Sequence, residues 1–336
     1  MEARLYKALK DQKVQCNLCK HFCIIKNGSR GICNVRENQE GVLKTLIYGN
    51  LIARNVDPIE KKPLFHFFPG SLSLSVASVG CNFKCLFCQN ADIAQMPSDR
   101  NGLIMGDFFK PDEIVKMAKK RKCKSIAYTY TEPTVNFEFV LDTARLAAEK
   151  GIKNVLITNG YISDQALKIL SPYIDAANVD LKAFNNEFYT KKCNAELENV
   201  QKTLIQMKSS GIFLEITTLI IPGLNDNPDE IQKLALFIAE SLGRETPWHV
   251  SRFHPAYKLC DRPGTPVETL NNARKTGLKT GLKYVYTGNV HGSGFENTLC
   301  CNCGKLLIKR SGFMVEENFI VNGSCPDCNT KTDGLF

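Results

Sequence analysis

The alternation of strand and helix patterns over residues 71–290 constrains the fold of this 336-residue chain more than any other feature. Apolar runs that read as strands alternate with segments such as 228–242, in which Leu234 and Ile238 share one helical face. This alternation is typical of parallel βα units. Strands are expected at 72–79, 125–131, 154–158, 176–182, 213–221, 248–254 and 283–287, and helices at 111–121, 134–150, 163–171, 187–208, 228–242 and 266–277.

Polar sequences lie at the carboxyl ends of five of these expected strands. In a barrel of parallel strands, the carboxyl ends form the active face. We therefore favour a partial (β/α)6 TIM-type barrel over residues 71–297 rather than a doubly wound sheet, with its site at that face. The polar sequences are Thr131-Glu132-Pro133, Thr158-Asn159-Gly160, Asp180-Leu181-Lys182, Pro222-Gly223 and Phe253-His254-Pro255.

The loop directly after the first expected strand holds three cysteines, Cys81, Cys85 and Cys88, in the spacing Cys-x3-Cys-x2-Cys. Thiolates this close in sequence can converge on one metal centre, but a [4Fe–4S] cluster normally takes four. The odd number indicates a cluster with one iron left open for a ligand that is not protein. The alternatives are a three-cysteine zinc site or three buried thiols, although a catalytic zinc site usually includes histidine or a carboxylate.

Residues 1–70 form a cysteine-rich N-terminal region with four cysteines within 18 residues: Cys16, Cys19, Cys23 and Cys33. Four thiolates at such spacing indicate a metal site. Structural zinc and an auxiliary iron–sulfur cluster both accept four thiolates, so the sequence leaves both open. The stretch 57–70 contains three prolines and an aromatic cluster, and it reads as an ordered, non-regular connection.

Residues 298–336 form a C-terminal region with two Cys-x2-Cys knuckles that have 21 residues between them. Short strands are expected between the knuckles, at 305–310 and 313–321. Paired knuckles are typical of a tetrahedral four-cysteine zinc ribbon, which would fold a tail too short for its own core. A redox or nucleic-acid role is the alternative. The expected zinc ligands are Cys300, Cys303, Cys325 and Cys328.

Composition limits the class of protein. Fifteen cysteines without an export signal indicate metal and cluster ligands in a reducing cytoplasm, so we expect a cytoplasmic protein. No run approaches 18 apolar residues, and no membrane span is expected. Much of the net charge of +9 lies in residues 116–124, at the end of an expected helix, where a solvated face is a simpler reading than nucleic-acid binding.

The cysteine loop resembles the signature of radical S-adenosylmethionine (SAM) enzymes, Cys-x3-Cys-x-aromatic-Cys, which Cys81, Cys85, Phe87 and Cys88 match in order. The resemblance implies the same partial barrel and a [4Fe–4S] cluster whose fourth iron is chelated by the amino and carboxylate groups of SAM. Reduction would cleave SAM to methionine and a 5′-deoxyadenosyl radical, which takes a hydrogen atom from an unidentified substrate. The protein would orient the reactants and exclude water.

The resemblance also implies a contact to the SAM amino group near Glu132. Radical SAM enzymes commonly have a Gly-Gly-Glu stretch here, and in this chain Tyr130 and Thr131 take the glycine places. The contact would come from Glu132, or from the Thr131 hydroxyl and nearby carbonyl groups. Otherwise Glu132 is a favourable charge at the start of a helix.

Further strand ends resemble those of pyruvate formate-lyase activating enzymes, which place SAM contacts there. By this resemblance Thr158, Asn159, Asp180 and Lys182 would bind the cofactor. Asp180 and Lys182 are otherwise an ion pair at the barrel rim. His254, at the sixth strand end, matches a histidine that those enzymes place near SAM, with a structural role as the alternative.

Longer stretches resemble one subgroup, the radical SAM component of the AmmeMemoRadiSam system, itself similar to pyruvate formate-lyase activating enzymes. Its name implies partnership with Memo-type and AMMECR-type proteins, besides a reducing electron donor. Two other functions stay open: an activase that acts on a glycyl-radical partner protein, and a multi-zinc adaptor without catalysis. The matching stretches include 57–64, 128–133, 179–184, 218–226, 247–255 and 284–289.

Overall fold

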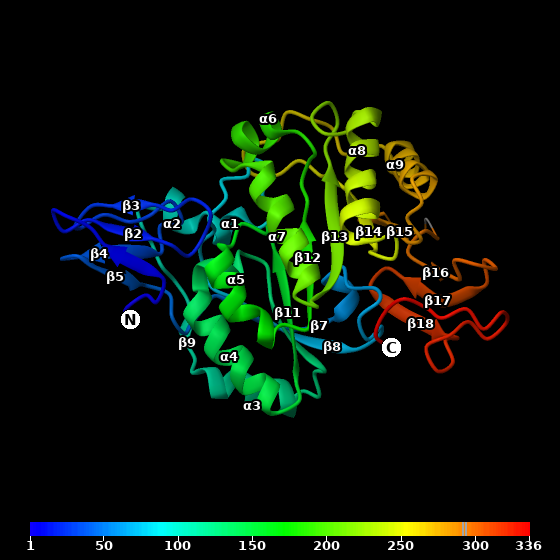
Figure 1. The fold of residues 1–336 in the computed structure, drawn as a ribbon, viewed down its shortest axis with the longest axis horizontal. Coiled ribbons are helices and arrows are strands. Elements are labelled where there is room, and N and C mark those ends of the chain that lie inside the picture. The colour runs from blue at the N-terminus through cyan, green and yellow to red at the C-terminus, as the bar shows by residue number, and fades with distance from the viewer. Residues whose placement is uncertain (291, 293) are drawn as a thin grey trace.

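The centre of the molecule is an eight-stranded sheet, seen in a computed structural model that describes residues 1–290, 292 and 294–336 (Figure 1). The first strand of the sheet in sequence is antiparallel to its neighbour, and the other seven are parallel. In order across the sheet the strands are β15 (Val285–Gly288), β14 (Trp248–Arg252), β13 (Phe213–Ile220), β12 (Ala176–Asp180), β11 (Lys153–Thr158), β10 (Ser125–Tyr128), β8 (Leu72–Ala77) and β7 (Ala53–Pro58).

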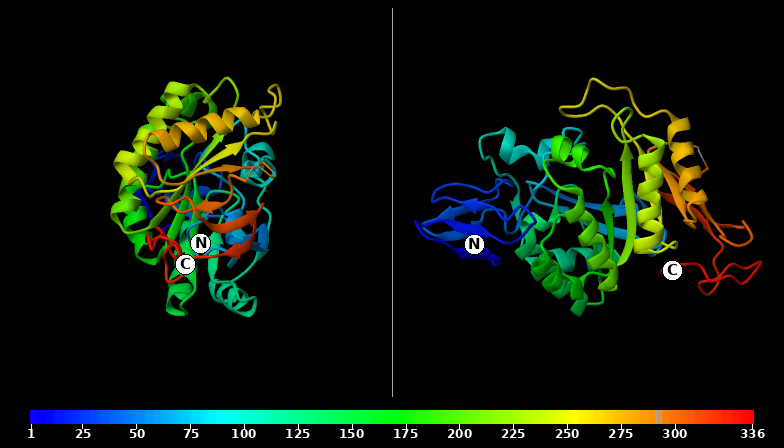
Figure 2. Two further views of the ribbon diagram at one scale, coloured as in Figure 1. Left: turned by 90° about the vertical axis from the view of Figure 1, so that its right-hand side faces the viewer. Right: turned by 45° about the horizontal axis from the view of Figure 1, so that its top comes forward.

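The helices between these strands cover the outer face of the curved sheet (Figures 1 and 2). Capping residues stabilise the first turns of several helices. Ser163 accepts a hydrogen bond from the backbone N–H of Ala166, and Asn227 caps the helix that begins with Pro228. The helices are α1 (Ala91–Ala94), α2 (Met96–Asp99), α3 (Pro111–Lys120), α4 (Phe137–Glu149), α5 (Asp164–Leu170), α6 (Asn186–Phe188), α7 (Leu197–Ser209), α8 (Pro228–Phe237) and α9 (Val267–Lys279).

This arrangement confirms the expected α/β fold of the partial-barrel kind. All seven expected strands are present, and within the described chain β15 and β7 lie at opposite edges of the sheet, so the barrel is open. Parallel strands covered by helices are buried on both faces, which explains their continuous apolar runs.

One expected helix, 187–208, is wrong. The chain forms α6, a π-helical turn at Tyr189–Cys193 and then α7, because Asn194 adopts a left-handed backbone with φ of 57°. The carbonyl groups before this break are used elsewhere: the backbone N–H of Lys84 donates to Cys193 at 2.8 Å, and that of Leu86 donates to Lys192 at 3.0 Å. The break therefore supports the cysteine loop.

The N-terminal region lies at one end of the molecule (Figure 1). The expected connection at 57–70 is regular at its start, because β7 runs to Pro58 and a 3-10 turn follows at Ile59–Lys61. The region's other strands are β1 (Tyr6–Ala8), β2 (Val14–Cys16), β3 (Ile24–Ile25), β4 (Arg36–Gln39), β5 (Val42–Thr45) and β6 (Asn50–Leu51), the last paired with β9 (Asp107–Phe108).

The C-terminal region lies at the other end, as an antiparallel sheet of β16 (Thr298–Leu299), β17 (Leu306–Ser311) and β18 (Met314–Asn318) (Figure 1). It docks onto the segment before β8. The Leu335 N–H donates to the carbonyl of His66 at 2.8 Å, and Arg310 donates to the carbonyl of Phe65 at 2.7 Å. The division into regions 1–70, 71–297 and 298–336 remains a prediction.

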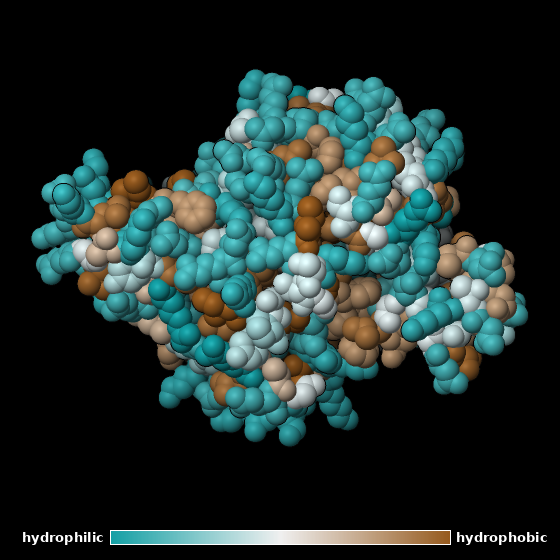
Figure 3. All heavy atoms as spheres, viewed as in Figure 1, coloured by the Kyte–Doolittle hydropathy of each residue, from teal (hydrophilic) through white to brown (hydrophobic). Residues whose placement is uncertain are grey.

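The molecular surface over the helices is mostly hydrophilic (Figure 3). Within the described chain, every helix is too short or too polar to cross a membrane.

Candidate functional site

A cavity of about 420 Å³ lies at the carboxyl ends of the central strands. It brings together the cysteine loop and the polar strand ends, as expected for the active face of a barrel. His254 is exposed and is not among the described residues that line this cavity, so its role remains a prediction. The predicted site residues that do line it are Cys81, Cys85, Phe87, Cys88, Thr131, Glu132, Thr158, Asn159, Asp180 and Lys182.

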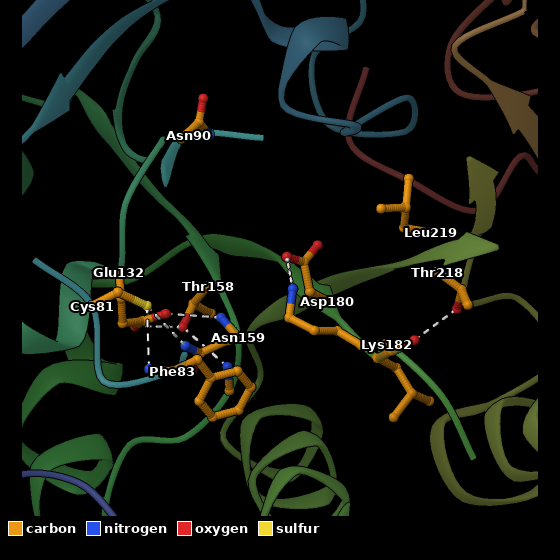
Figure 4. A network of polar contacts seen from close by, with 12 residues as sticks. Cys81, Phe83, Asn90, Glu132, Thr158, Asn159, Asp180, Lys182, Thr218 and Leu219 are labelled. Atoms are coloured by element: carbon orange, nitrogen blue, oxygen red, sulfur yellow. Dashed lines mark hydrogen bonds and ion pairs between the residues drawn. The ribbon is translucent and has the colours of Figure 1, made fainter. Parts of the chain in front are cut away.

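The Cys81 sulfur is held by two N–H donors. The backbone N–H of Phe83 lies 3.3 Å from Sγ, and Nδ2 of Asn159 lies 3.7 Å from it (Figure 4). Burial, and then the nearby Glu132 carboxylate, raise the pKa of the free Cys81 thiol well above its usual value. A bound cation centre would reverse this effect and favour the thiolate.

Glu132 ties two strand ends to each other. Its carboxylate accepts hydrogen bonds from the hydroxyl of Thr158 at 2.8 Å and the backbone N–H of Asn159 at 2.9 Å (Figure 4). It also accepts one from the backbone N–H of Thr134 at 2.9 Å. Burial raises the pKa of Glu132, and these hydrogen bonds oppose the rise. The carboxylate thus caps the 3-10 turn Pro133–Asn136, as the alternative interpretation required, and also fixes the strand end that reaches Cys81.

Asp180 and Lys182 form the ion pair that was the alternative to ligand contact, with Nζ and Oδ2 2.8 Å apart (Figure 4). Burial would lower the pKa of Lys182, but the Asp180 carboxylate raises it well above its usual value. Lys182 is therefore charged, and it presents this charge on the cavity wall beside the cysteine loop.

Tyr130 has a backbone conformation that is unusual for a residue with a side chain. Its φ of +64° lies in the left-handed region, which favours glycine. The residue is held from two sides: Nδ2 of Asn90 donates to its carbonyl at 2.8 Å, and its hydroxyl donates to Asp57. Asp57 is also paired with Lys62 at 2.8 Å, and the hydrogen bonds from Lys62 and Tyr130 hold the pKa of Asp57 well below its usual range, against the effect of burial.

Two features near this site were not predicted from the sequence. Lys61 and Lys62 line the cavity, and the only signal for them was the matching stretch 57–64. Cys193 is fully buried next to Cys85, and its hydrogen bonding, followed by burial, raises the pKa of Cys85. Because Cys193 is not among the described residues that line the cavity, it does not face the same space as the three loop cysteines.

The donor set suits an iron–sulfur cluster. Three thiols face one cavity, while the two nearby carboxylates are already taken up, Glu132 by four hydrogen bonds and Asp180 by Lys182. Histidine is absent from the described residues that line the cavity, so a zinc site of mixed protein ligands would need one of those carboxylates. The same cavity extends from the thiols to the strand ends, so a further ligand has room beside the cysteine loop.

The four C-terminal cysteines are gathered for a single ion. The sulfur atoms of Cys300 and Cys328 lie 3.5 Å apart, and those of Cys303 and Cys325 lie 3.7 Å apart. Tetrahedral zinc with bonds of about 2.3 Å places its sulfur ligands about 3.8 Å apart. The four-cysteine cluster is therefore present, and zinc as its metal remains a prediction.

The four N-terminal cysteines also meet, around a small cavity of their own that Cys16, Cys19, Cys23 and Cys33 all line. Burial, followed by the neighbouring thiols, raises the pKa of Cys19 well above its usual value. The predicted metal or cluster site at these residues stays a prediction, but the fold brings all four together.

Comparison with known proteins agrees with this geometry. The sequence model of the Radical SAM superfamily matches residues 75–238. The uncharacterized protein MJ0808 of Methanocaldococcus jannaschii is 49% identical over 99% of this chain and 98% of its own. The pyruvate formate-lyase-activating enzyme of Clostridium pasteurianum is 24% identical over 61% of this chain and 87% of its own.

A solved structure shares the fold. Streptococcus suis SuiB, bound to its precursor peptide SuiA, superposes with a TM-score of 0.52 at 18% identity, over 69% of this chain and 52% of SuiB. At this identity the likeness is one of fold alone.

Proposed function

This chain belongs to the radical SAM superfamily and is related to pyruvate formate-lyase-activating enzymes, and from this premise we propose that Cys81, Cys85 and Cys88 hold the catalytic [4Fe–4S] cluster. When bound, the cluster and SAM supply reductive cleavage of the sulfonium to methionine and a 5′-deoxyadenosyl radical, which abstracts hydrogen from the substrate. The observation that carries the assignment is a single cavity shared by these three thiols and the polar strand ends.

Different residues around the cavity would contact different groups of SAM. Lys182 is charged and would attract the carboxylate of SAM, while Asp180 keeps it aimed at the cavity. The hydroxyl of Thr131 donates to the carbonyl of Ser78 at 2.7 Å, and this contact holds the strand end where the amino group would bind. Glu132 would act mainly through Thr158 and Asn159, because its oxygens already accept hydrogen bonds from the protein.

The N–H groups directed at Cys81 would tune the cluster. Hydrogen bonds to cluster sulfurs stabilise the more negative, reduced state and so raise the reduction potential. Phe83 and Asn159 supply two such donors, and Asn159 is held in turn by its side-chain bond to Asn82 at 2.8 Å. Replacing Asn159 should therefore change the potential without removing a ligand.

The finer proposal is that the chain is the radical SAM component of an AmmeMemoRadiSam system. The stretches that resemble this subgroup support it, as do the cysteine-rich regions at both ends. Memo-type and AMMECR-type proteins would then be partners, with a reducing electron donor. The substrate is a small molecule or a segment of a partner protein.

A second candidate is an activase that takes hydrogen from a glycine of a partner protein. The observation in its favour is the relative named as a pyruvate formate-lyase-activating enzyme, of which this chain covers 87%. An EPR doublet of a glycyl radical, formed on mixing the reduced enzyme and SAM with a candidate partner, would support it. Cleavage of SAM without such a signal for any partner favours a small-molecule substrate.

The proposed function is tested by product formation. Protein reconstituted anaerobically with iron and sulfide should convert SAM to 5′-deoxyadenosine when dithionite is added. Cys85→Ala should abolish this conversion, and Cys260→Ala, at an exposed cysteine, is the matched control that should retain it. Equal yields from the wild type and Cys85→Ala would reject the assignment.

A further inference from the structure

We propose that Cys16, Cys19, Cys23 and Cys33 hold a second [4Fe–4S] cluster, and that this cluster passes electrons to the one at Cys81, Cys85 and Cys88. The first half of the proposal stands on the N-terminal cavity alone. The second half, electron transfer, also rests on the proposed function.

The two four-cysteine sites differ in how their thiols are arranged. At the C-terminal site all four sulfur atoms lie within 4.8 Å of one another, as a single tetrahedral ion requires. In the part of the chain that the structure describes, no other group of three or more His, Cys, Asp or Glu ligands is gathered in this way. The N-terminal cysteines instead surround a cavity. An iron–sulfur cluster needs this arrangement, because its irons and sulfides lie between the four cysteine ligands.

Arg36 is an independent sign of an anionic guest in that cavity. It lines the cavity and is only 1% exposed. One of its nitrogens donates to Glu138 at 2.5 Å, but Nε and Nη1 are buried without a hydrogen-bond partner among the described residues. Unpaired buried donors of a charged group are costly and therefore rare. A four-iron cluster with four thiolates carries net negative charge and exposes sulfur acceptors, so it would satisfy both N–H groups.

Asn82 joins the N-terminal cavity to the catalytic one. It is fully buried and lines the N-terminal cavity, while the next residue in the chain, Cys81, lines the catalytic cavity. His21, placed between the N-terminal ligands, is bound through Nε2 to the Asn82 carbonyl at 2.9 Å. On the other side, Nδ2 of Asn159 donates to the Asn82 side chain at 2.8 Å. One buried residue, Asn82, therefore links the two sets of thiols.

The electron balance of the transfer is simple. A low-potential one-electron donor would reduce a cluster held by Cys16, Cys19, Cys23 and Cys33 from the 2+ to the 1+ state. The electron would then pass to the cluster held by Cys81, Cys85 and Cys88, which would change from 2+ to 1+ as the N-terminal cluster returned to 2+. No bond to cysteine forms or breaks, and no proton is transferred. The N-terminal region lies at one end of the molecule, where a donor can reach it (Figure 1).

Metal content tests the first half of the proposal directly. Wild-type protein purified without oxygen should contain about eight irons and eight sulfides per chain, with about one zinc. Replacing Cys19 and Cys23 by serine together should remove about half of the iron and sulfide. About four irons and two zinc ions in the wild type would overturn the second cluster.

Arg36→Lys tests the contact between the guanidinium and the cluster. The reduction potential of the N-terminal cluster, followed by EPR, should become more negative because N–H donors are lost. The signal of the cluster at Cys81 should not move. Arg30→Lys is the matched control, since Arg30 pairs with Glu37 at 2.9 Å on the same region and is not among the residues that line the cavity. Equal potentials for the wild type and Arg36→Lys would contradict the assigned role of Arg36.

Stoichiometry tests the electron transfer. Protein is fully reduced, freed of excess reductant and mixed with SAM. Since each electron cleaves one SAM, wild type should give about two 5′-deoxyadenosines per chain, and the double serine variant about one. Yields of about one from both would overturn the transfer but leave the proposed function intact. No product from either protein, although each holds the cluster at Cys81, Cys85 and Cys88, would instead reject the proposed function and the transfer with it.

Discussion

Replacing Gly80 with alanine should disturb the junction between the cysteine loop and the N-terminal region. Gly80 precedes Cys81 and has φ of +101°, a backbone that glycine adopts without strain. A Cβ atom added here would lie 2.6 Å from Cγ1 of Val35, which is fully buried. Val35 cannot yield easily, because β-branched side chains are stiff at χ1. The substitution therefore combines backbone strain with a steric clash.

The expected loss in the free energy of unfolding is the sum of the backbone strain and the steric clash. The left-handed backbone costs an L-residue about 1–2 kcal/mol, and overpacking a filled core costs about 1–3 kcal/mol. The free energy of unfolding should therefore fall by about 2–5 kcal/mol in Gly80→Ala. The control is Gly28→Ala, where φ is +73° but the added Cβ would meet no atom within 4 Å. It should show the backbone term alone, about 1–2 kcal/mol.

The assay is anaerobic urea unfolding of Gly80→Ala, Val35→Ala and the double variant. Truncating Val35 removes the clashing methyl groups, so the two substitutions should be non-additive by about 1–3 kcal/mol in the stabilising direction. Additivity within about 0.5 kcal/mol would refute the reasoning. Iron content of the same proteins shows whether the loop still holds its cluster.

Three further predictions concern individual side chains. Cys193→Ala should retain the cluster at Cys81 and its response to SAM, because Cys193 is not among the described residues that line the cavity; loss of about four irons would make Cys193 a ligand. Burial lowers the pKa of His66 to about 4, below the ordinary value of 6.5. The folded protein therefore holds His66 neutral, and its full contribution to stability is present above pH 6.5. As the pH falls from 6.5 toward 4, the free energy of unfolding should decrease by roughly 3 kcal/mol. Urea unfolding of His66→Gln should show a smaller loss between pH 7 and pH 4.5, and an equal loss would exclude His66 as the source. Cys303→Ser should remove about one zinc per chain and lower the thermal midpoint, whereas unchanged zinc content would show that another metal or none is bound there.

The sequence predicted the sheet and its active face because both rest on local patterns. Period-3.6 stripes and apolar runs set the order of the elements, and polar residues directly after the strands marked the carboxyl ends. The helix expected at 187–208 was wrong because its break depends on carbonyl groups that pair with Lys84 and Leu86, about a hundred residues earlier.

Other features could not be predicted because they depend on tertiary contacts. β7 was missed since its sequence, Ala-Arg-Asn-Val-Asp-Pro, is polar and takes its structure from pairing with β8. The glycine-like backbone of Tyr130 depends on Asn90 and Asp57, which are distant in sequence. Arg36 had no signal at all, because only the folded cavity shows that two of its nitrogens lack partners.

The EPR spectrum of the cluster at Cys81, Cys85 and Cys88, recorded with and without SAM, shows whether one iron is open to SAM. It is best recorded on the reduced Cys19→Ser/Cys23→Ser variant, so that no N-terminal signal overlaps. We expect SAM to change the spectrum, and isotopically labelled SAM to show hyperfine coupling to the cluster, because one iron lacks a protein ligand. A spectrum that SAM leaves unchanged would mean that SAM does not bind the cluster held by these three cysteines.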